Sequence, residues 1–151
     1  MNAKELLNRV KEIKKEIEIK SRLAMTYRDI ATGLQSPRYS DMPKNPNRKL
    51  QPMADALDKA MAFEEEIELL KEEIIEVKEH IYQVIQHIEI KEHQLILLER
   101  YVNESTWSQI SKTIGYSRSR LFEKHNDALL DFSVAFEKFG LSRTRVDYVG
   151  H

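Results

Sequence analysis

The sequence predicts an all-α protein that begins with a long, coiled-coil-like antiparallel helical hairpin. Its 151 residues include only 4 Gly and 4 Pro, whereas a β-sandwich or an α/β fold needs turn formers every ~8–12 residues. Hydrophobic residues make up 41% and charged residues 32% of the chain, a mixture typical of long amphipathic helices. Two long stretches also repeat their apolar residues with a period of seven.

The first heptad stretch predicts the first arm of the hairpin. Its members are spaced alternately by four and three, and Lys20 is the only polar one. The apolar members are Leu6, Val10, Ile13, Ile17, Ala24, Tyr27, Ala31 and Leu34. A period of 3.5 residues keeps one apolar seam against a partner helix, as a coiled coil requires. Lys20 is therefore interpreted as a snorkelling side chain or a device that fixes the register.

The second heptad stretch has no polar member and predicts the second arm. Its seam comprises Met53, Ala56, Ala60, Phe63, Ile67, Leu70, Ile74, Val77, Ile81, Val84 and Ile88. Leu57, Ile75 and Ile85 widen this seam, which predicts a further neighbour, either the rest of the chain or a second subunit. The first arm is basic and the second is strongly acidic, so opposite charges favour their pairing.

All four prolines, Pro37, Pro43, Pro46 and Pro52, lie between the arms. Because proline lacks a backbone donor and clashes with the preceding turn, residues 33–52 are expected to form a loop that is either disordered or functional. A break near Glu89 is expected to end the second arm, although one very long helix is the alternative. The predicted organisation is a hairpin or oligomerisation part at 1–88, a second domain at 89–140 and a basic tail at 141–151.

Two shorter helices follow, each with its own start and stop signals. Thr106 is a good N-cap with Gln109 in capping-box position, and Gly115 suits the left-handed end of a helix over 107–114. Ser117 is a second N-cap, and the next helix runs from Arg118 to about residue 138, before Gly140. Its expected apolar face comprises Leu121, Ala128, Leu129, Phe132 and Phe136.

The spacing in this region predicts a helix-turn-helix, which needs a short helix, a sharp turn and a second helix at a wide angle. Six positions fill the slots that such packing requires: Ile110, Ser111, Ile114, Gly115, Tyr116 and Leu121. Leu95, Leu98, Tyr101 and Val102 are expected to continue the apolar phase as a supporting helix. Trp107 and Tyr116 are interpreted as core residues rather than as base-stacking groups.

The side chains left outside this core suggest double-stranded DNA as the partner. The first candidates for DNA contact are the N-cap Ser117 and the first-turn residues Arg118, Ser119 and Arg120 of the second helix. Such a helix directs its N-terminal residues to base edges in the major groove, where Arg can contact guanine and Glu can accept from cytosine. The remaining candidates are Glu123 and Lys124 one turn later, and Lys112 and Arg100 as contacts to the DNA backbone.

The stretch LLERYVNESTWSQISKTIGYSRSRLFEKHNDAL resembles the promoter-reading last domain of bacterial sigma factors. The whole chain is similar to small regulators from phages and mobile elements of Gram-positive bacteria, related to the RinA and ArpU groups. The matching positions are the SDMP motif at Ser40, Asp41, Met42 and Pro43, and Arg100, Tyr101, Trp107, Ile110, Gly115, Tyr116 and Ser117. The resemblance implies transcriptional regulation, often activation of late or packaging genes at promoters beside host RNA polymerase.

Several other classes are disfavoured. The chain has no Cys, no glycine-rich phosphate loop and no paired carboxylates beyond ordinary charged helix faces, so no enzyme activity or cofactor is expected. His80, His87 and His93 with Glu76 and Glu89 suggest a metal site, but their spacing differs from that of di-iron bundles, and no metal is expected. No apolar run approaches the ~20 residues that span a bilayer, so a cytoplasmic location without membrane contact is expected.

We therefore expect a sequence-specific DNA-binding transcription regulator, forming a homo-oligomer in which a dimer is favoured. Two alternatives stay open. A small-terminase-like DNA-packaging subunit also joins a helix-turn-helix to an oligomerising helical part, but its reader usually comes first in the chain. An adaptor that contacts RNA polymerase or a repressor through the acidic helix would show no salt-sensitive DNA affinity, whereas phosphate contacts weaken as salt rises.

Overall fold

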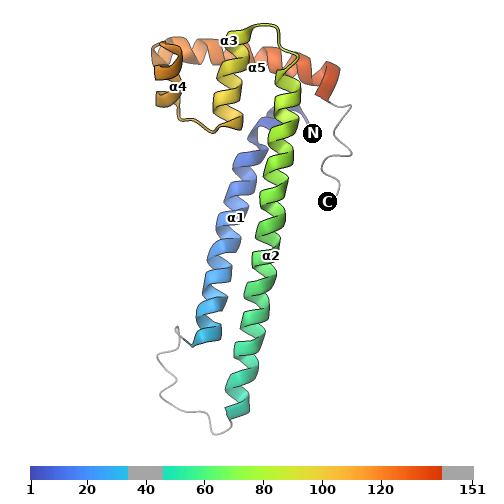
Figure 1. Ribbon diagram of the computed structural model, residues 1–151, viewed down its shortest axis with the longest axis vertical. Helices are drawn as coiled ribbons and strands as arrows, with labels where there is room; N and C mark the ends of the chain where they lie inside the picture. Colours follow the sequence, from blue (N-terminus) through green and yellow to red (C-terminus); the bar gives the residue numbers. More distant parts are fainter. Residues whose placement is uncertain (34–45, 141–151) are drawn as a thin grey trace. The chain divides into compact units, whose positions relative to one another are not determined.

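The computed structural model describes residues 1–33 and 46–140, and every regular element in these ranges is helical (Figure 1). This confirms the all-α prediction. In chain order the elements are α1 (Ala3–Thr32), α2 (Pro46–Ile85), α3 (Lys91–Leu97), the π-helix η1 (Leu98–Val102), α4 (Trp107–Ile114) and α5 (Arg118–Phe139). Among these helices, none combines the length and apolarity needed to cross a membrane.

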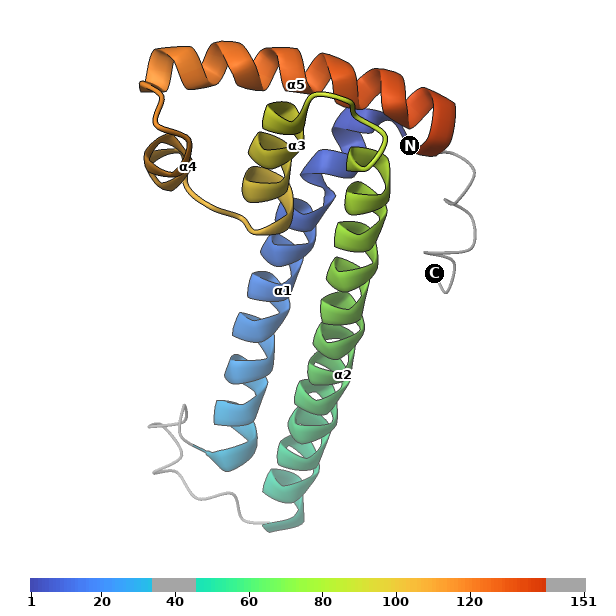
Figure 2. The same ribbon diagram turned by 45° about the horizontal axis from the view of Figure 1, so that its top comes forward.

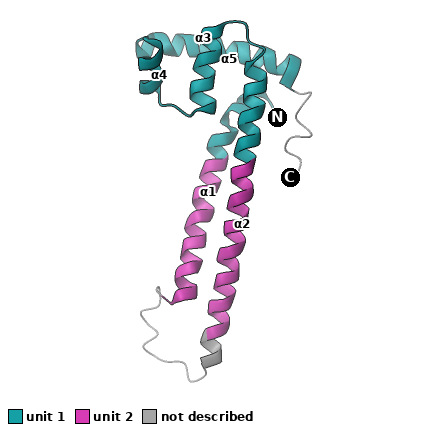
Figure 3. Cartoon of the chain, in the orientation of Figure 1, with its two compact units in different colours: residues 1–12, 73–151 teal, residues 13–72 magenta. Residues whose placement is uncertain are grey.

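The chain divides into two compact units, coloured separately in Figure 3. One unit comprises residues 13–72 and holds the central parts of the hairpin helices. The other comprises residues 1–12 and 73–151. The second unit thus contains the start of α1, the end of α2 and all the shorter helices.

In the unit of residues 13–72, α1 packs antiparallel against α2 along the predicted seam. Seam residues such as Ile13, Ala24, Ala60 and Ile67 are buried. Cross-helix ion pairs flank the seam: Arg28 Nη2 lies 2.7 Å from Glu64 Oε1. The basic arm therefore meets the acidic arm, as the charge pattern predicts.

Lys20, the one polar seam residue, is satisfied within this unit. Its Nζ lies 3.0 Å from Glu66 Oε1 and 3.9 Å from Glu16 Oε2, and 5.8 Å from the ring centroid of Phe63. The side chain is only 19% exposed. Its stem is therefore covered while the ammonium reaches acidic partners, as a snorkelling lysine does.

The prediction of a loop that extends to Pro52 is wrong at its second end. α2 begins at Pro46, and Pro52 lies inside it. Proline is well suited to the first helical position, where its missing N–H has no partner in any case. Pro52 removes one hydrogen bond near the start of a 40-residue helix, and the rest of the helix continues. Pro37, Pro43 and the SDMP motif at residues 40–43 lie outside the described residues, as does the basic tail at 141–151.

The three residues that widen the second seam have different environments. Ile85 is buried, whereas Leu57 is 37% exposed and Ile75 is 69% exposed. Leu57 belongs to the unit of residues 13–72, and Ile75 to the other unit. Each unit therefore leaves apolar α2 surface in water, which a single chain does not cover.

The unit of residues 1–12 and 73–151 has a continuous apolar core. Its most deeply buried residues include Leu6, Val10, Val77, Ile81, Val84, Ile96, Leu97, Phe132 and Phe136. An ion pair joins α1 to α2 in this unit, because Arg9 Nη2 lies 2.6 Å from Glu73 Oε2. The start of α1, the end of α2, α3 and the second half of α5 all contribute buried apolar side chains, and the ring centroid of His80 on α2 lies 6.1 Å from that of Phe136 on α5.

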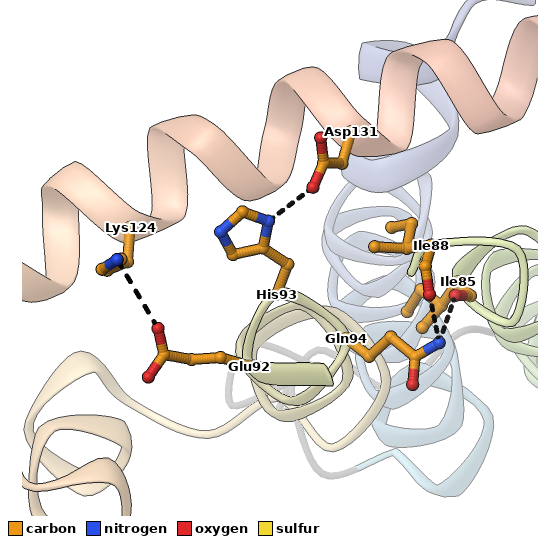
Figure 4. Close-up of polar contacts among 7 residues, drawn as sticks. All are labelled: Ile85, Ile88, Glu92, His93, Gln94, Lys124 and Asp131. Atoms are coloured by element: carbon orange, nitrogen blue, oxygen red, sulfur yellow. Dashed lines mark hydrogen bonds and ion pairs between the residues drawn. The ribbon is translucent and has the colours of Figure 1, made fainter. Parts of the chain in front are cut away.

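The helix breaks between Ile85 and Lys91, close to the predicted position near Glu89. A single helix running to residue 114 is therefore excluded. Gln94 secures the break, because its Nε2 donates to the carbonyl oxygens of Ile88 at 2.6 Å and Ile85 at 3.2 Å (Figure 4). Ile85 is the last residue of α2, and its carbonyl also accepts from the Ile88 N–H at 3.0 Å, so Gln94 adds a second bond at the end of the helix.

The heptad pattern of buried residues does not continue through this break, although the sequence predicted that it would. Ile96 and Leu97 are fully buried, whereas Leu95 is 39% exposed. The prediction that Leu95 supports the core is therefore wrong, because α3 is a separate helix with its own inward face. Leu98, Tyr101 and Val102 lie on η1 and are partly buried.

Candidate nucleic-acid interface

α4 begins and ends where its sequence signals indicate. The Thr106 hydroxyl accepts from the Gln109 N–H at 3.1 Å, and the Gln109 side chain accepts from the Thr106 N–H at 2.8 Å. Gly115 ends the helix with φ +86°, a conformation that costs glycine little. The predicted capping box and left-handed helix end are both confirmed.

The turn between α4 and α5 is short and is tied to both helices. The Ser111 hydroxyl, on α4, donates a short hydrogen bond to the Tyr116 carbonyl. The Ser117 hydroxyl accepts from the Arg120 N–H at 3.2 Å and caps α5. Ser111 thus forms a bond that an alanine at this position could not form.

A small core holds α3, α4 and α5 together. Ile96, Ile110 and Leu121 are fully buried. Trp107, Ile114 and Tyr116 pack against them and are partly buried. All four apolar slots of the predicted motif therefore contribute to one cluster, and Trp107 covers its side. Figure 2 shows α4 next to the first turns of α5, and α3 alongside a later part of α5.

The predicted base-contacting side chains lie on the exposed start of α5. Arg118, Ser119, Arg120 and Glu123 are all exposed. The Arg118 guanidinium carbon lies 5.7 Å from the ring centroid of Phe122, and that of Arg120 lies 4.7 Å from the ring of Tyr116. Stacking on an aromatic face leaves the N–H edge of a guanidinium available to a ligand.

The other predicted residues have different surroundings. Lys112 is exposed on α4. Lys124 turns toward α3, where its Nζ lies 3.8 Å from Glu92 Oε1. Arg100 stacks 4.4 Å from the ring centroid of Trp107 and donates to the Ser105 carbonyl at 3.2 Å. The structure therefore brings the first turn of α5 together with α4, while Lys124 and Arg100 have contacts within the protein.

Contacts from α3 position α5, and the sequence analysis missed them. His93 Nδ1 lies 2.5 Å from Asp131 Oδ2, and Glu92 pairs with Lys124 (Figure 4). Glu92 also accepts a hydrogen bond from the Tyr116 hydroxyl at 2.6 Å. Because these partners lie at least 24 residues apart, no local sequence pattern reveals them.

The turn that leads into α4 depends on η1. Glu99 accepts from the Ser105 hydroxyl at 2.8 Å and from the Asn103 amide at 3.2 Å. Glu104 adopts a left-handed φ of +57°, which is uncommon for a residue with a side chain. Lys78 of α2 donates to its carboxylate at 2.8 Å. The sequence gave no signal for a π-helix at Leu98–Val102.

His125 joins α5 to η1 and α4 through aromatic contacts. Its Nε2 lies 2.9 Å from the Tyr101 hydroxyl oxygen, and its ring centroid lies 4.6 Å from that of Trp107. Burial, with a smaller contribution from the Arg100 charge, lowers the pKa of His125 to about 4. Burial also raises the pKa of Tyr101. The neutral forms of both rings are therefore favoured in this cluster.

The histidines that suggested a metal site make other contacts. His80 Nε2 lies 3.0 Å from the Gly140 carbonyl oxygen, and the His87 ring stacks on Phe139 with centroids 3.8 Å apart. His93 contacts Asp131, as described above. Within residues 1–33 and 46–140, no three His, Asp or Glu side chains are grouped as a metal site would require. These histidines instead contact α5 or the residue that follows it.

The protein is all-helical. A helical hairpin is followed along the chain by two capped helices, α4 and α5, and the start of α5 is exposed. By its sequence, the chain belongs to a family described as "protein of unknown function (DUF1492)", whose model matches residues 33–133. That match covers well over half of the chain and includes α2 to α4 and most of α5. No curated protein matches the chain, and no solved structure matches it.

Proposed function

We propose that this protein is a sequence-specific DNA-binding transcription regulator of a phage or mobile element. In this proposal α4 and α5 form a helix-turn-helix, and the first turn of α5 enters the major groove. The observation that carries it is the exposed pair Arg118 and Arg120 at the start of a capped helix. A helix in this position directs its first residues to base edges.

The contacts that hold α3, α4 and α5 together support this proposal. A recognition helix must be held at a fixed angle, because a displacement of its first turn removes several base contacts together. Here the capping box of α4, the core of Ile96, Ile110 and Leu121, and the Glu92 contact to Tyr116 all limit movement of α5. Few of these contacts would be needed if the first turn of α5 were only solvated surface.

The roles of the side chains follow from their surroundings. Arg118, Ser119, Arg120 and Glu123 are placed for base edges and adjacent phosphates. Ser117 keeps its hydroxyl on the α5 cap. Lys112 is placed for the DNA backbone. Lys124 and Arg100, which have protein contacts, hold the unit in shape and add positive charge near the DNA.

The oligomer is the second part of the proposal. Exposed apolar side chains lie on α1 and α2 within the unit of residues 13–72, including Ile19, Leu23, Leu57 and Met61. A second copy of the chain would remove them from water. A symmetric dimer predicts operator half-sites separated by whole helical turns of about 34–36 Å.

The resemblance to RinA- and ArpU-related regulators supports activation at promoters beside host RNA polymerase, in the cytoplasm of the bacterial host. No observation favours the packaging subunit or the adaptor over this function. Mass measurement of the full chain separates the first of them, because a ring of many subunits would indicate a packaging protein. Salt-insensitive or absent DNA binding would indicate the adaptor.

DNase footprinting on the intergenic segments around the chain's own gene tests the proposal. We expect a discrete protected site that disappears when Arg118→Ala and Arg120→Ala are combined. The matched control combines Lys15→Ala and Arg22→Ala, which remove two exposed charges from α1 and should leave the protected site. Unchanged protection with the α5 double variant would refute the assignment.

A further inference from the structure

An exposed phenylalanine lies beside the predicted base-contacting arginines and has no role in the function described so far. Phe122 is the fifth residue of α5 and is 39% exposed. Its ring meets the Trp107 ring edge-on, with centroids 5.2 Å apart and an interplanar angle of 77°. Part of the ring therefore packs on α4, and the remainder faces water.

Phe122 lies on the same face of α5 as Arg118, because residues four apart are neighbours on a helix surface. The Arg118 guanidinium carbon lies 5.7 Å from the Phe122 ring centroid. Arg118 Nη1 also donates to the Ser108 hydroxyl of α4 at the long distance of 3.5 Å. One cation and one apolar ring thus share a surface next to the start of α4.

The chemistry of this pair matches two neighbouring features of the major groove. Guanine presents the O6 and N7 acceptors that an Arg fork can bind, and thymine presents its C5-methyl group, which an apolar side chain such as Phe can contact. Four helical residues rise about 6 Å, and successive base pairs are about 3.4 Å apart. Both side chains therefore reach base pairs no more than about two steps apart.

Resting on the proposed DNA-binding function, we infer that Phe122 is a specificity-determining residue that contacts the C5-methyl of a thymine next to the guanine read by Arg118. The charges around the ring favour duplex DNA over a protein partner. The Arg118 guanidinium carbon lies 5.7 Å from the ring centroid, and Arg120 is exposed on the same first turn of α5. A base methyl supplies the apolar contact without requiring a neutral surface.

In vitro selection from a duplex library with a random central segment provides the first measurement, using full-length protein. We expect the wild-type chain to select a motif with a guanine and a thymine within two steps. Phe122→Ala should lose the thymine preference and keep the guanine. Leu130→Ala is the matched control, because it shortens another exposed apolar side chain of α5 and should select the wild-type motif.

In the second measurement, the thymines of the selected duplex are replaced one at a time by deoxyuridine, which lacks only the methyl group. We expect an affinity loss of about four-fold at one position for the wild-type chain, corresponding to one methyl group returned to water. This arm needs no variant, so it remains informative if Phe122→Ala does not fold. In a folded Phe122→Ala chain, judged by circular dichroism, the same replacement should have no effect.

The two proposals fail differently. If the wild-type chain selects no motif, DNA reading by α5 is wrong, and this inference falls with it. If a motif is selected but uridine is tolerated at every thymine, or Phe122→Ala keeps the thymine preference, only the role of Phe122 is overturned. Phe122 would then serve to cover Trp107.

Discussion

Gly115 offers a direct test of the turn that joins α4 to α5. Its φ is +86°, and a Cβ placed there would have no heavy atom within 4 Å. The cost of Gly115→Ala therefore comes from the backbone conformation alone. A left-handed residue with a Cβ costs about 1–2 kcal/mol, and the loss of unfolded-state entropy offsets about 0.4–1 kcal/mol of that.

We therefore expect Gly115→Ala to lower the free energy of unfolding by about 1 kcal/mol. For a chain of this size the melting temperature should fall by about 2–4 °C. Urea unfolding followed by circular dichroism measures the change. Gly115→Asn is the matched control, because asparagine tolerates the left-handed region better than alanine and should lose less. An alanine variant as stable as the wild type would show that the turn does not require a left-handed residue.

Three further predictions concern the cap, the seam and pH. Thr106→Ala should lower the free energy of unfolding by about 1 kcal/mol in urea titrations, because α4 loses its N-cap; no loss would contradict the capping box. Lys20→Met should raise the free energy of unfolding by up to about 1 kcal/mol, because an apolar side chain replaces the one polar seam residue and only a partly exposed ion pair is lost. A large decrease would show that the pair with Glu66 is structurally essential. Because the pKa of His125 is lowered, its contribution to the free energy of unfolding is complete above the unfolded pKa of 6.5. That contribution declines as the pH falls through 6.5 toward about 4. The full effect of about 3 kcal/mol should be roughly halved by solvent screening of this partly exposed ring. Acid titration of stability, compared with His125→Gln, measures it, and an equal pH slope in both chains would contradict this cause.

Features set by neighbouring residues could be predicted from the sequence. The heptad seams depend only on periodicity, and their members are buried or partly buried wherever the structure describes them. The caps at Thr106 and Ser117 and the glycine at 115 act within three or four residues of the chain. Each is a local rule of backbone geometry, so tertiary packing had little opportunity to override it.

The missed features depend on residues that are distant in sequence. The apolar pattern continued through residues 86–90, so periodicity could not show that α3 restarts with Ile96 and Leu97 inward. Phe122 was a different omission, because a local signal existed. It follows the buried Leu121, and successive helical residues point about 100° apart. The side chain after a core position therefore points to the edge of the core face, where part of a large ring such as Phe122 stays exposed.

The contacts that α3 makes hold α5 in place and thereby fix the direction of the arginines at its start. Glu92 accepts from the Tyr116 hydroxyl with one oxygen and pairs with Lys124 through the other, so one side chain holds both the turn and the second turn of α5. Tyr116 in turn supports the guanidinium of Arg120. Because His93 fixes Asp131 farther along the same helix, α3 holds α5 at two separate points. Rotation of α5 about its own axis would break both contacts, so α3 determines the direction of Arg120, the residue that we propose contacts DNA.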